Sequence, residues 1–260
     1  MNSRTRNIFL SLLAMIAVAG VGLIVWSQRG AAPTVSSGDT APTVSSGDTA
    51  PTASSGDEAL KTVSYTAQGQ TQTVTLTKIT TDAFAGSRFV TGAADAPVTV
   101  VEFADYECPA CGVYATMTAA QFKSEFVDTG KVRLAFRDFP LSQHQNAPLA
   151  AVAASCANVE KRWEAMHDIL FRSQAQWSES SSDAFKTQLI DYARQIGMDS
   201  NAFQTCLSSN QFAGAIQADM DAGAAAGLEA TPTFIINGYR LSGALPIEGL
   251  RAVLLQFGVK

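Results

Sequence analysis

A pair of cysteines directly after a strongly apolar segment constrains this chain more than any other feature. The segment APVTVVEF (96–103) is followed by DYECPACGVYA (105–115), which carries Cys108 and Cys111. The near-continuous apolar run with its valines predicts a strand buried on both faces. Pro109 suits the first turn of a helix, where its missing N–H would have no partner anyway. The cysteines are therefore expected where a buried strand ends and a helix begins.

Three kinds of site use such a pair: a structural metal clip, a permanent disulfide, and a redox centre that makes and breaks its own disulfide. A structural zinc site takes four ligands, often from two such pairs. This chain has one pair with that spacing and two histidines, His144 and His167. A permanent Cys108–Cys111 bond would close too short a ring to restrict the unfolded chain much. Redox exchange is therefore favoured, and no metal or other cofactor is expected.

Composition narrows the classes of protein. The chain has 260 residues, of which 47% are apolar, so it can bury a sizeable core. Its net charge of −5 and the lack of a basic stripe argue against nucleic acid as a partner. Its 4 cysteines are too few for a disulfide-dense scaffold but suffice for one redox pair and one structural bond.

The N-terminus predicts a membrane anchor. Residues 8–26 carry no charge and match the length of about 20 residues that spans a bilayer as a helix. Arg4 and Arg6 precede this span and Arg29 follows it, which favours a cytoplasmic N-terminus within an anchor of residues 1–29. The alternative is a cleaved signal peptide, whose apolar part is usually shorter. In both cases the remainder leaves the cytoplasm for a compartment in which disulfides persist.

Residues 30–60 predict a flexible repeat linker. APTVSSGDT occurs twice, at 32–40 and 41–49, and is followed by APTASSGDE. Proline, serine, threonine and glycine dominate, so the segment has too few bulky apolar side chains to offset its ordering entropy. At about 30 residues its root-mean-square reach would be roughly 30 Å.

Residues 61–260 predict a single folded domain. Alternating residues at 62–79 indicate a β-hairpin, and 131–136 indicate a strand parallel to 96–103 because a helix connects the two. The segment at about 146–227 is typical of helices alone. Two short strands around Asn237-Gly238 form a second hairpin, and Pro246 begins a last helix.

Several segments resemble the DsbA-like thiol:disulfide oxidoreductases of the thioredoxin superfamily. EFADYECPACGVYA is similar to their active-site segment and TPTFIING to their cis-proline loop, while FRDFPLSQHQNAPLAAVAASCA and RWEAMHDILF resemble their helical insertion. The resemblance covers residues 95–260. It implies an α/β thioredoxin fold with an inserted all-helical subdomain, here preceded by a single transmembrane helix and a disordered linker.

The position of each cysteine predicts its role. Cys108 would lie just before a helix and Cys111 in its first turn, where unpaired N–H groups and the helix dipole stabilise a thiolate. We expect Cys108 to be the exposed nucleophile and Cys111, beneath it, the resolving cysteine. Asp105 and Glu107 carry charges that oppose the Cys108 thiolate. No histidine lies between the cysteines, so a moderate pKa shift is expected.

Further residues complete the predicted site. Glu102 lies inside the apolar strand. It is either a solvent-facing polar position or, as the resemblance implies, a buried acid that takes the proton of the resolving thiol. The resemblance also implies that Thr231 and Pro232 face the cysteines, with the backbone of Thr231 binding an extended substrate. Arg137 and His144 fit the family pattern with a hydrogen-bonding rather than a catalytic role. His167 is expected to be an ordinary helix residue.

Cys156 and Cys206 form a second question. Both lie in the predicted helical insertion, where a structural disulfide between two helices is the favoured interpretation. A second redox pair and two buried free thiols are the alternatives. Neither cysteine lies in a Cys-x-x-Cys context, which disfavours redox activity.

The sequence thus predicts a single-pass membrane protein whose catalytic domain lies on the extracytoplasmic side, periplasmic or at the cell surface. It would introduce disulfides into unfolded or reduced exported proteins, and a membrane redox partner would reset its cysteines. A disulfide isomerase or reductase on the same fold is one alternative. A non-catalytic chaperone or binding module is another, although such a module would not need both cysteines.

Overall fold

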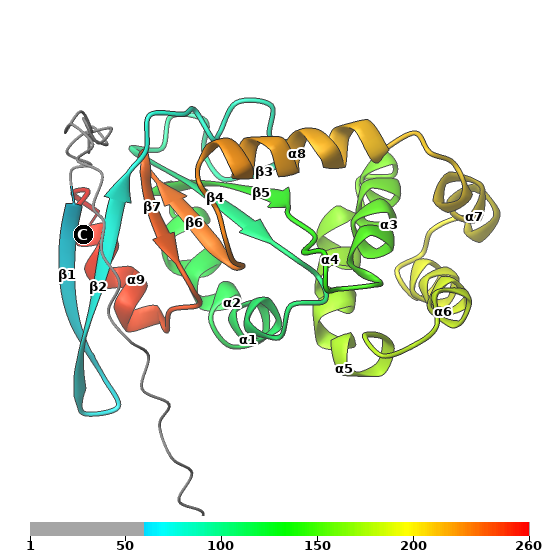
Figure 1. The fold of residues 1–260 in the computed structure, drawn as a ribbon, viewed down its shortest axis with the longest axis horizontal. Coiled ribbons are helices and arrows are strands. Elements are labelled where there is room, and N and C mark those ends of the chain that lie inside the picture. Colours follow the sequence, from blue (N-terminus) through cyan, green and yellow to red (C-terminus); the bar gives the residue numbers. More distant parts are fainter. Residues whose placement is uncertain (1–59, 260) are drawn as a thin grey trace, which may run out of the picture. The chain divides into compact units, whose positions relative to one another are not determined.

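A computed structural model describes residues 60–259, which form a mixed β-sheet with helices on both faces and a helical block at one end (Figure 1). The predicted membrane span at 8–26 and nearly all of the linker lie outside these residues. Within residues 60–259, no helix is both long enough and apolar enough to cross a membrane.

The sheet has seven strands in the order β1-β2-β7-β6-β4-β5-β3. The bounds are β1 Leu60–Ala67, β2 Gln70–Lys78, β3 Phe89–Thr91, β4 Val98–Ala104, β5 Val132–Asp138, β6 Thr233–Ile236 and β7 Tyr239–Ser242. β4 and β5 pair in parallel as the sequence predicted, and every other pair is antiparallel. The short edge strand β3 was not foreseen.

Both predicted hairpins are confirmed. β1 and β2 turn at Gln68 and Gly69, whose φ angles are 51° and 75°. β6 and β7 turn at Asn237 and Gly238, with φ angles of 45° and 80°. Two central residues with positive φ match the twist of the flanking strands, which is why Asn-Gly favours a two-residue hairpin.

The helix after the cysteines is broken where the sequence predicted one continuous helix. It consists of α1 (Pro109–Met117), α2 (Ala119–Phe122) and the π-helical turn η1 (Lys123–Val127). Thr118, with φ −122°, interrupts it. α1, α2 and the last helix, α9 (Ile247–Leu255), cover one face of the sheet, and α8 (Ala213–Ala225) covers the other (Figure 1).

The remaining helices form the block between β5 and β6. They are α3 (Ala147–Val159), α4 (Trp163–Arg172), α5 (Gln174–Trp177), α6 (Ser182–Gln195) and α7 (Ser200–Ser208). Their core is continuous with Ala104 and Phe136 at the ends of the central strands and includes Cys108 and Cys111. The segment with Cys108 and Cys111 therefore lies at the junction of sheet and insertion.

Candidate functional site

Cys108 and Cys111 lie where β4 leads into α1. Cys108 is the residue before Pro109, with an extended backbone (φ −69°, ψ 123°), and its carbonyl accepts a hydrogen bond from the Gly112 N–H at 3.1 Å. Both cysteines are free thiols in this structure. Cys111 is fully buried, and Cys108 is only 7% exposed, so the predicted nucleophile is far less exposed than the sequence suggested.

Their surroundings separate the two thiols electrostatically. The pKa of Cys108 falls to about 5, mainly because the Cys111 side chain hydrogen-bonds to it. The Thr231 side chain and the backbone N–H groups of Cys111 and Ala110 lower the pKa further, and together they outweigh burial, which raises it. Burial raises the pKa of Cys111 far above its usual range. At neutral pH Cys108 is therefore a thiolate and Cys111 a thiol, as their predicted roles require.

The cis-proline loop lies against this pair. The Thr231–Pro232 peptide bond is cis, and Thr231 is buried. When protonated, the Cys108 thiol donates to the Thr231 carbonyl at 3.3 Å. Only the thiol can make this contact, so ionisation of Cys108 frees the carbonyl for another donor. The predicted substrate-binding backbone thus lies within hydrogen-bond reach of the predicted nucleophile.

Asp105 is held in a network of hydrogen bonds. Its carboxylate accepts from the N–H groups of Glu107 at 2.7 Å and Leu141 at 2.8 Å, and lies 2.7 Å from His144 Nδ1. The Glu107 carboxylate accepts from the Asn146 N–H at 2.6 Å. These donors hold the two carboxylates in place. Neither carboxylate is among the main causes of the Cys108 pKa, which falls further than the predicted moderate shift because hydrogen bonds from Cys111, Thr231 and nearby N–H groups outweigh burial. The network also gives His144 the expected hydrogen-bonding role.

Gln174, on α5 of the insertion, is a site residue that the sequence did not indicate. Its amide nitrogen donates to the carbonyls of Tyr106 at 2.7 Å and Cys108 at 2.9 Å. Its Oε1 lies 2.6 Å from where a Cβ on Gly112 would be, so the approach requires a glycine there. A glycine inside a helix, just after Cys111, was the available signal, because it costs helix stability and often marks a close approach.

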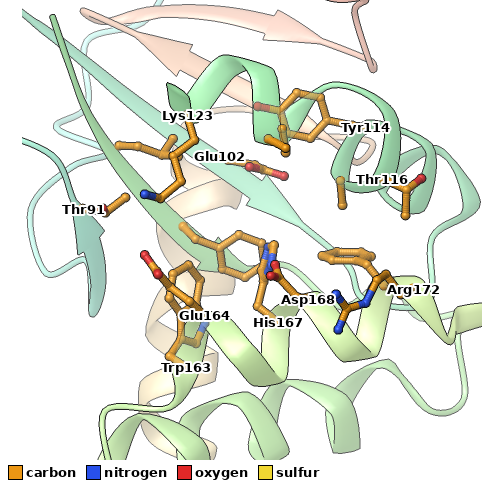
Figure 2. Close-up of a pocket in the computed structure, with 16 residues that line it drawn as sticks. Thr91, Glu102, Tyr114, Thr116, Lys123, Trp163, Glu164, His167, Asp168 and Arg172 are labelled. Atoms are coloured by element: carbon orange, nitrogen blue, oxygen red, sulfur yellow. The ribbon is translucent and has the colours of Figure 1, made fainter. Parts of the chain in front are cut away.

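Glu102 lies on β4 and is 4% exposed. The solvent-facing alternative is therefore wrong, because the side chain is buried. The same burial raises the pKa of Glu102 to about 8. Its side chain points into a cavity between the sheet, α1 and α4 (Figure 2). Tyr114, one turn after Cys111, lines the same cavity, but neither cysteine does.

Arg137 ties three parts of the domain together. Its Nε donates to Asp219 on α8 at 2.7 Å, and its Nη1 donates to the carbonyls of Ala83 at 3.0 Å and Ala85 at 2.8 Å. Its role is therefore structural. His167 lies on helix α4, packs among aromatic rings and also lines the cavity. The sequence predicted the helix but not the cavity position.

A disulfide joins Cys156 on α3 to Cys206 on α7, with a Cα–Cα distance of 5.9 Å. Cys156 is buried in the core of the insertion. Among residues 60–259, no cluster of three or more His, Cys, Asp or Glu side chains is suited to a metal ion.

The fold is a thioredoxin fold with an inserted helical block, and the paired cysteines lie where its first helix begins. A family model described as thioredoxin matches residues 85–255, and the chain belongs to that family.

Proteins similar to this chain include disulfide bond formation proteins and Na⁺/H⁺ antiporters. The crystal structure of oxidised BdbD from Bacillus subtilis superposes with a TM-score of 0.57 at 26% identity, covering 66% of this chain and 91% of that one. Disulfide bond formation protein D of Bacillus subtilis is 29% identical over 153 residues, which is 57% of this chain and 67% of that protein. Na⁺/H⁺ antiporter NhaA 3 of Salinispora tropica is 35% identical over 168 residues, which is 64% of this chain but 24% of the antiporter. This chain thus spans about a quarter of the antiporter's length.

Proposed function

We propose that this protein is a thiol:disulfide oxidoreductase that donates the Cys108–Cys111 disulfide to reduced proteins. The observation that carries the proposal is the contrast between the two thiols, with the pKa of Cys108 lowered to about 5 and that of Cys111 raised by burial. A low pKa makes Cys108 a good leaving group, which speeds release of the oxidised substrate.

The reaction follows from this contrast. A substrate thiolate attacks the Cys108 sulfur of the protein disulfide, forming a mixed disulfide and releasing Cys111, which takes up a proton because its pKa is raised. A second substrate thiolate then attacks the substrate sulfur of the mixed disulfide. This second attack yields an oxidised substrate and the Cys108 thiolate. Two substrate thiols are oxidised, the protein pair is reduced, and the two substrate protons go to Cys111 and to solvent.

Glu102 and the cis-proline loop serve this reaction in the proposal. Glu102 exchanges the proton of Cys111, a role supported by a pKa of about 8, close to neutral pH. The backbone of Thr231, next to Pro232, pairs with an extended substrate. This substrate-binding role is supported by the short distance between the Thr231 carbonyl and the Cys108 sulfur.

The direction of exchange is part of the proposal. A strongly lowered pKa stabilises the reduced protein and so favours giving a disulfide away. The name of the Bacillus subtilis relative, a disulfide bond formation protein, supports the same direction. An isomerase or reductase would need an electron donor to keep the pair reduced, and a binding module would need no thiolate.

The place of action is also proposed. Residues 1–29 anchor the chain in a membrane and residues 30–60 tether the domain on the extracytoplasmic side, as their sequence pattern supports. There the domain meets unfolded or reduced exported proteins, and a membrane redox partner reoxidises its cysteines. Removal of residues 1–29 should leave disulfide exchange in vitro intact, and loss of folding would contradict the tether.

Oxidative refolding of a reduced model protein, RNase A, tests the function. The oxidised full-length protein should restore RNase activity stoichiometrically, and turnover should require an added oxidant. Cys108→Ala should reduce the rate to that without protein. Acceleration only of scrambled RNase would support an isomerase, and no acceleration at all would support a binding module.

A further inference from the structure

A cavity of about 530 Å³ lies between the sheet and α4, on the face of the sheet that α1 covers (Figure 2). Its lining is rich in aromatic side chains from three elements, α1, β5 and α4: Tyr114, Phe136, Trp163, His167 and Phe171. The volume lies within the range of small-molecule sites, which are mostly apolar with a few placed polar groups.

Glu102 supplies the polar group. Its side chain points into the middle of the cavity (Figure 2) and is 4% exposed. Among residues 60–259 it has no hydrogen-bond partner, and burial alone accounts for its altered pKa. The Glu102 carboxyl therefore faces the cavity without a protein partner, and a molecule bound there can pair with it.

The aromatic wall suits a cation. Ring centroids lie 5.6 Å apart for Phe136 and Trp163, 5.1 Å for Trp163 and His167, and 5.0 Å for His167 and Phe171. This continuous set of rings meets the cavity beside a carboxylate. Aromatic faces attract cations through their quadrupole, most strongly away from water.

The charges at the rim favour the same ligand. Glu164 and Asp168 contribute carboxylates from α4, while Lys123 and Arg172 contribute cations. Lys123 is already paired with Asp128 at 2.7 Å, so less of its charge acts on the cavity. Asp168 is likewise 3.3 Å from His167 Nδ1, so less of its charge acts on the cavity. An ionised Glu102 then adds a negative charge inside the cavity, which disfavours an anionic ligand.

We propose that this cavity binds a small organic ammonium compound, with its cationic head between the Glu102 carboxylate and the aromatic rings. The apolar body of the ligand would fill the space against Phe136 and Phe171. The site shares Glu102 with the proposed exchange reaction, but neither cysteine lines the cavity, and ligand binding can be measured without disulfide exchange.

Binding should release a proton. The pKa of Glu102 is raised to about 8, so its carboxyl is mostly protonated in the empty cavity at pH 7. A bound cation favours the carboxylate and displaces that proton. The other titratable side chains facing the cavity are Tyr114, Lys123, Glu164, His167, Asp168 and Arg172. Burial raises the pKa of Tyr114 well above its usual range, so Tyr114 stays protonated throughout.

Calorimetric titration of the full-length protein at pH 7 tests the site with three probes of similar size: benzylamine, benzyl alcohol and benzoate. Benzylamine should bind at least about tenfold more tightly than benzyl alcohol, which corresponds to one good charge interaction. Benzoate should bind most weakly. Titrations in two buffers of different ionisation enthalpy should show nearly one proton released per benzylamine bound.

Variants separate this site from unspecific binding. Glu102→Gln should lower the benzylamine affinity about tenfold and abolish proton release, while leaving the benzyl alcohol affinity unchanged. Glu248→Gln, an exposed position on α9 outside the cavity, is the matched control and should change nothing. The wild-type probe series and proton count stand even if Glu102→Gln fails to fold. Equal binding of amine and alcohol, absent proton release, or no saturable binding would each overturn the proposal.

Discussion

The two cysteine pairs differ in their place on helices more than in their surroundings. Cys108, Cys111 and Cys156 all belong to one hydrophobic core, yet one pair is reduced and the other bonded. Cys108 and Cys111 lie at the start of α1, whereas Cys156 and Cys206 lie in the C-terminal halves of α3 and α7. Burial alone therefore does not decide which cysteines are reactive.

Helix position accounts for the difference. At a helix start, free N–H groups and the positive dipole end stabilise a thiolate, and this favours the reduced pair. Near a helix end, the negative dipole end disfavours a thiolate, so reduction of Cys156–Cys206 has no such gain. The first arrangement suits a disulfide that is given away, and the second suits a permanent bond.

The largest expected effect is on exchange. In Cys111→Ala the nucleophile remains without its resolving partner, so reduced substrate proteins mixed with oxidant should accumulate as mixed disulfides on Cys108. Mass spectrometry of the trapped species identifies the cysteine. The matched double variant Cys156→Ala/Cys206→Ala should retain turnover. Adducts on Cys156 or Cys206 in the Cys111→Ala protein would break the division of roles between the pairs.

The next effect is on stability. Loss of the Cys156–Cys206 bond, which spans 50 positions, should lower the free energy of unfolding by up to about 4 kcal/mol, because the unfolded chain gains freedom. Chemical denaturation of the double variant measures it. Opening Cys108–Cys111 in the wild type should instead stabilise the protein at pH 7. If both changes destabilised the protein equally, the two bonds would have the same role.

The pH dependence of the reduced protein should show a slightly smaller effect. The folded pKa of Cys108, about 5, is depressed, so its stabilisation is complete above the unfolded pKa and is lost as pH falls through 5. Between pH 7 and pH 4, the reduced form should lose about 3 kcal/mol relative to the oxidised form. Unfolding of both forms at each pH measures the difference. A constant gap would contradict a depressed pKa.

The smallest effect concerns the contact between the insertion and α1. Gly112→Ala places a Cβ against Gln174 and should cost about 1–2 kcal/mol through the two displaced hydrogen bonds. In a Gln174→Ala background the same change should cost much less. Gly214→Ala, on α8 with open space around it, is the control and should be neutral or stabilising. Equal costs with and without Gln174 would contradict the contact.

Short stretches of sequence were enough to predict much of the fold. The valine-rich strand, the Cys-Pro-x-Cys segment and the Asn237-Gly238 turn each express backbone chemistry within a few residues, and the structure has the predicted elements there. The three-residue strand β3 and the break at Thr118 lack such a local signal. Both depend on what packs against them.

The site was less predictable because its hydrogen bonds and pKa values depend on residues that are far apart in the sequence. Gln174 reaches the Cys108 carbonyl from 66 positions away, and only the glycine at 112 hinted at that approach. The Cys108 pKa shift depends mainly on the hydrogen bond from the Cys111 side chain, and Thr231, which lies 123 positions away in the sequence, also contributes. The sequence indicated that the cysteines lie at a helix start, but it did not reveal these contacts.

A redox titration that reads both pairs in one sample tests the central claim most directly. The full-length protein is equilibrated in glutathione or dithiothreitol buffers, alkylated, and digested for mass spectrometry. Cys108–Cys111 should be half reduced between about −120 and −230 mV, and Cys156–Cys206 should stay closed to below about −300 mV. A Cys108–Cys111 potential near about −270 mV, like that of a reductase, or joint opening of both bonds would contradict the account.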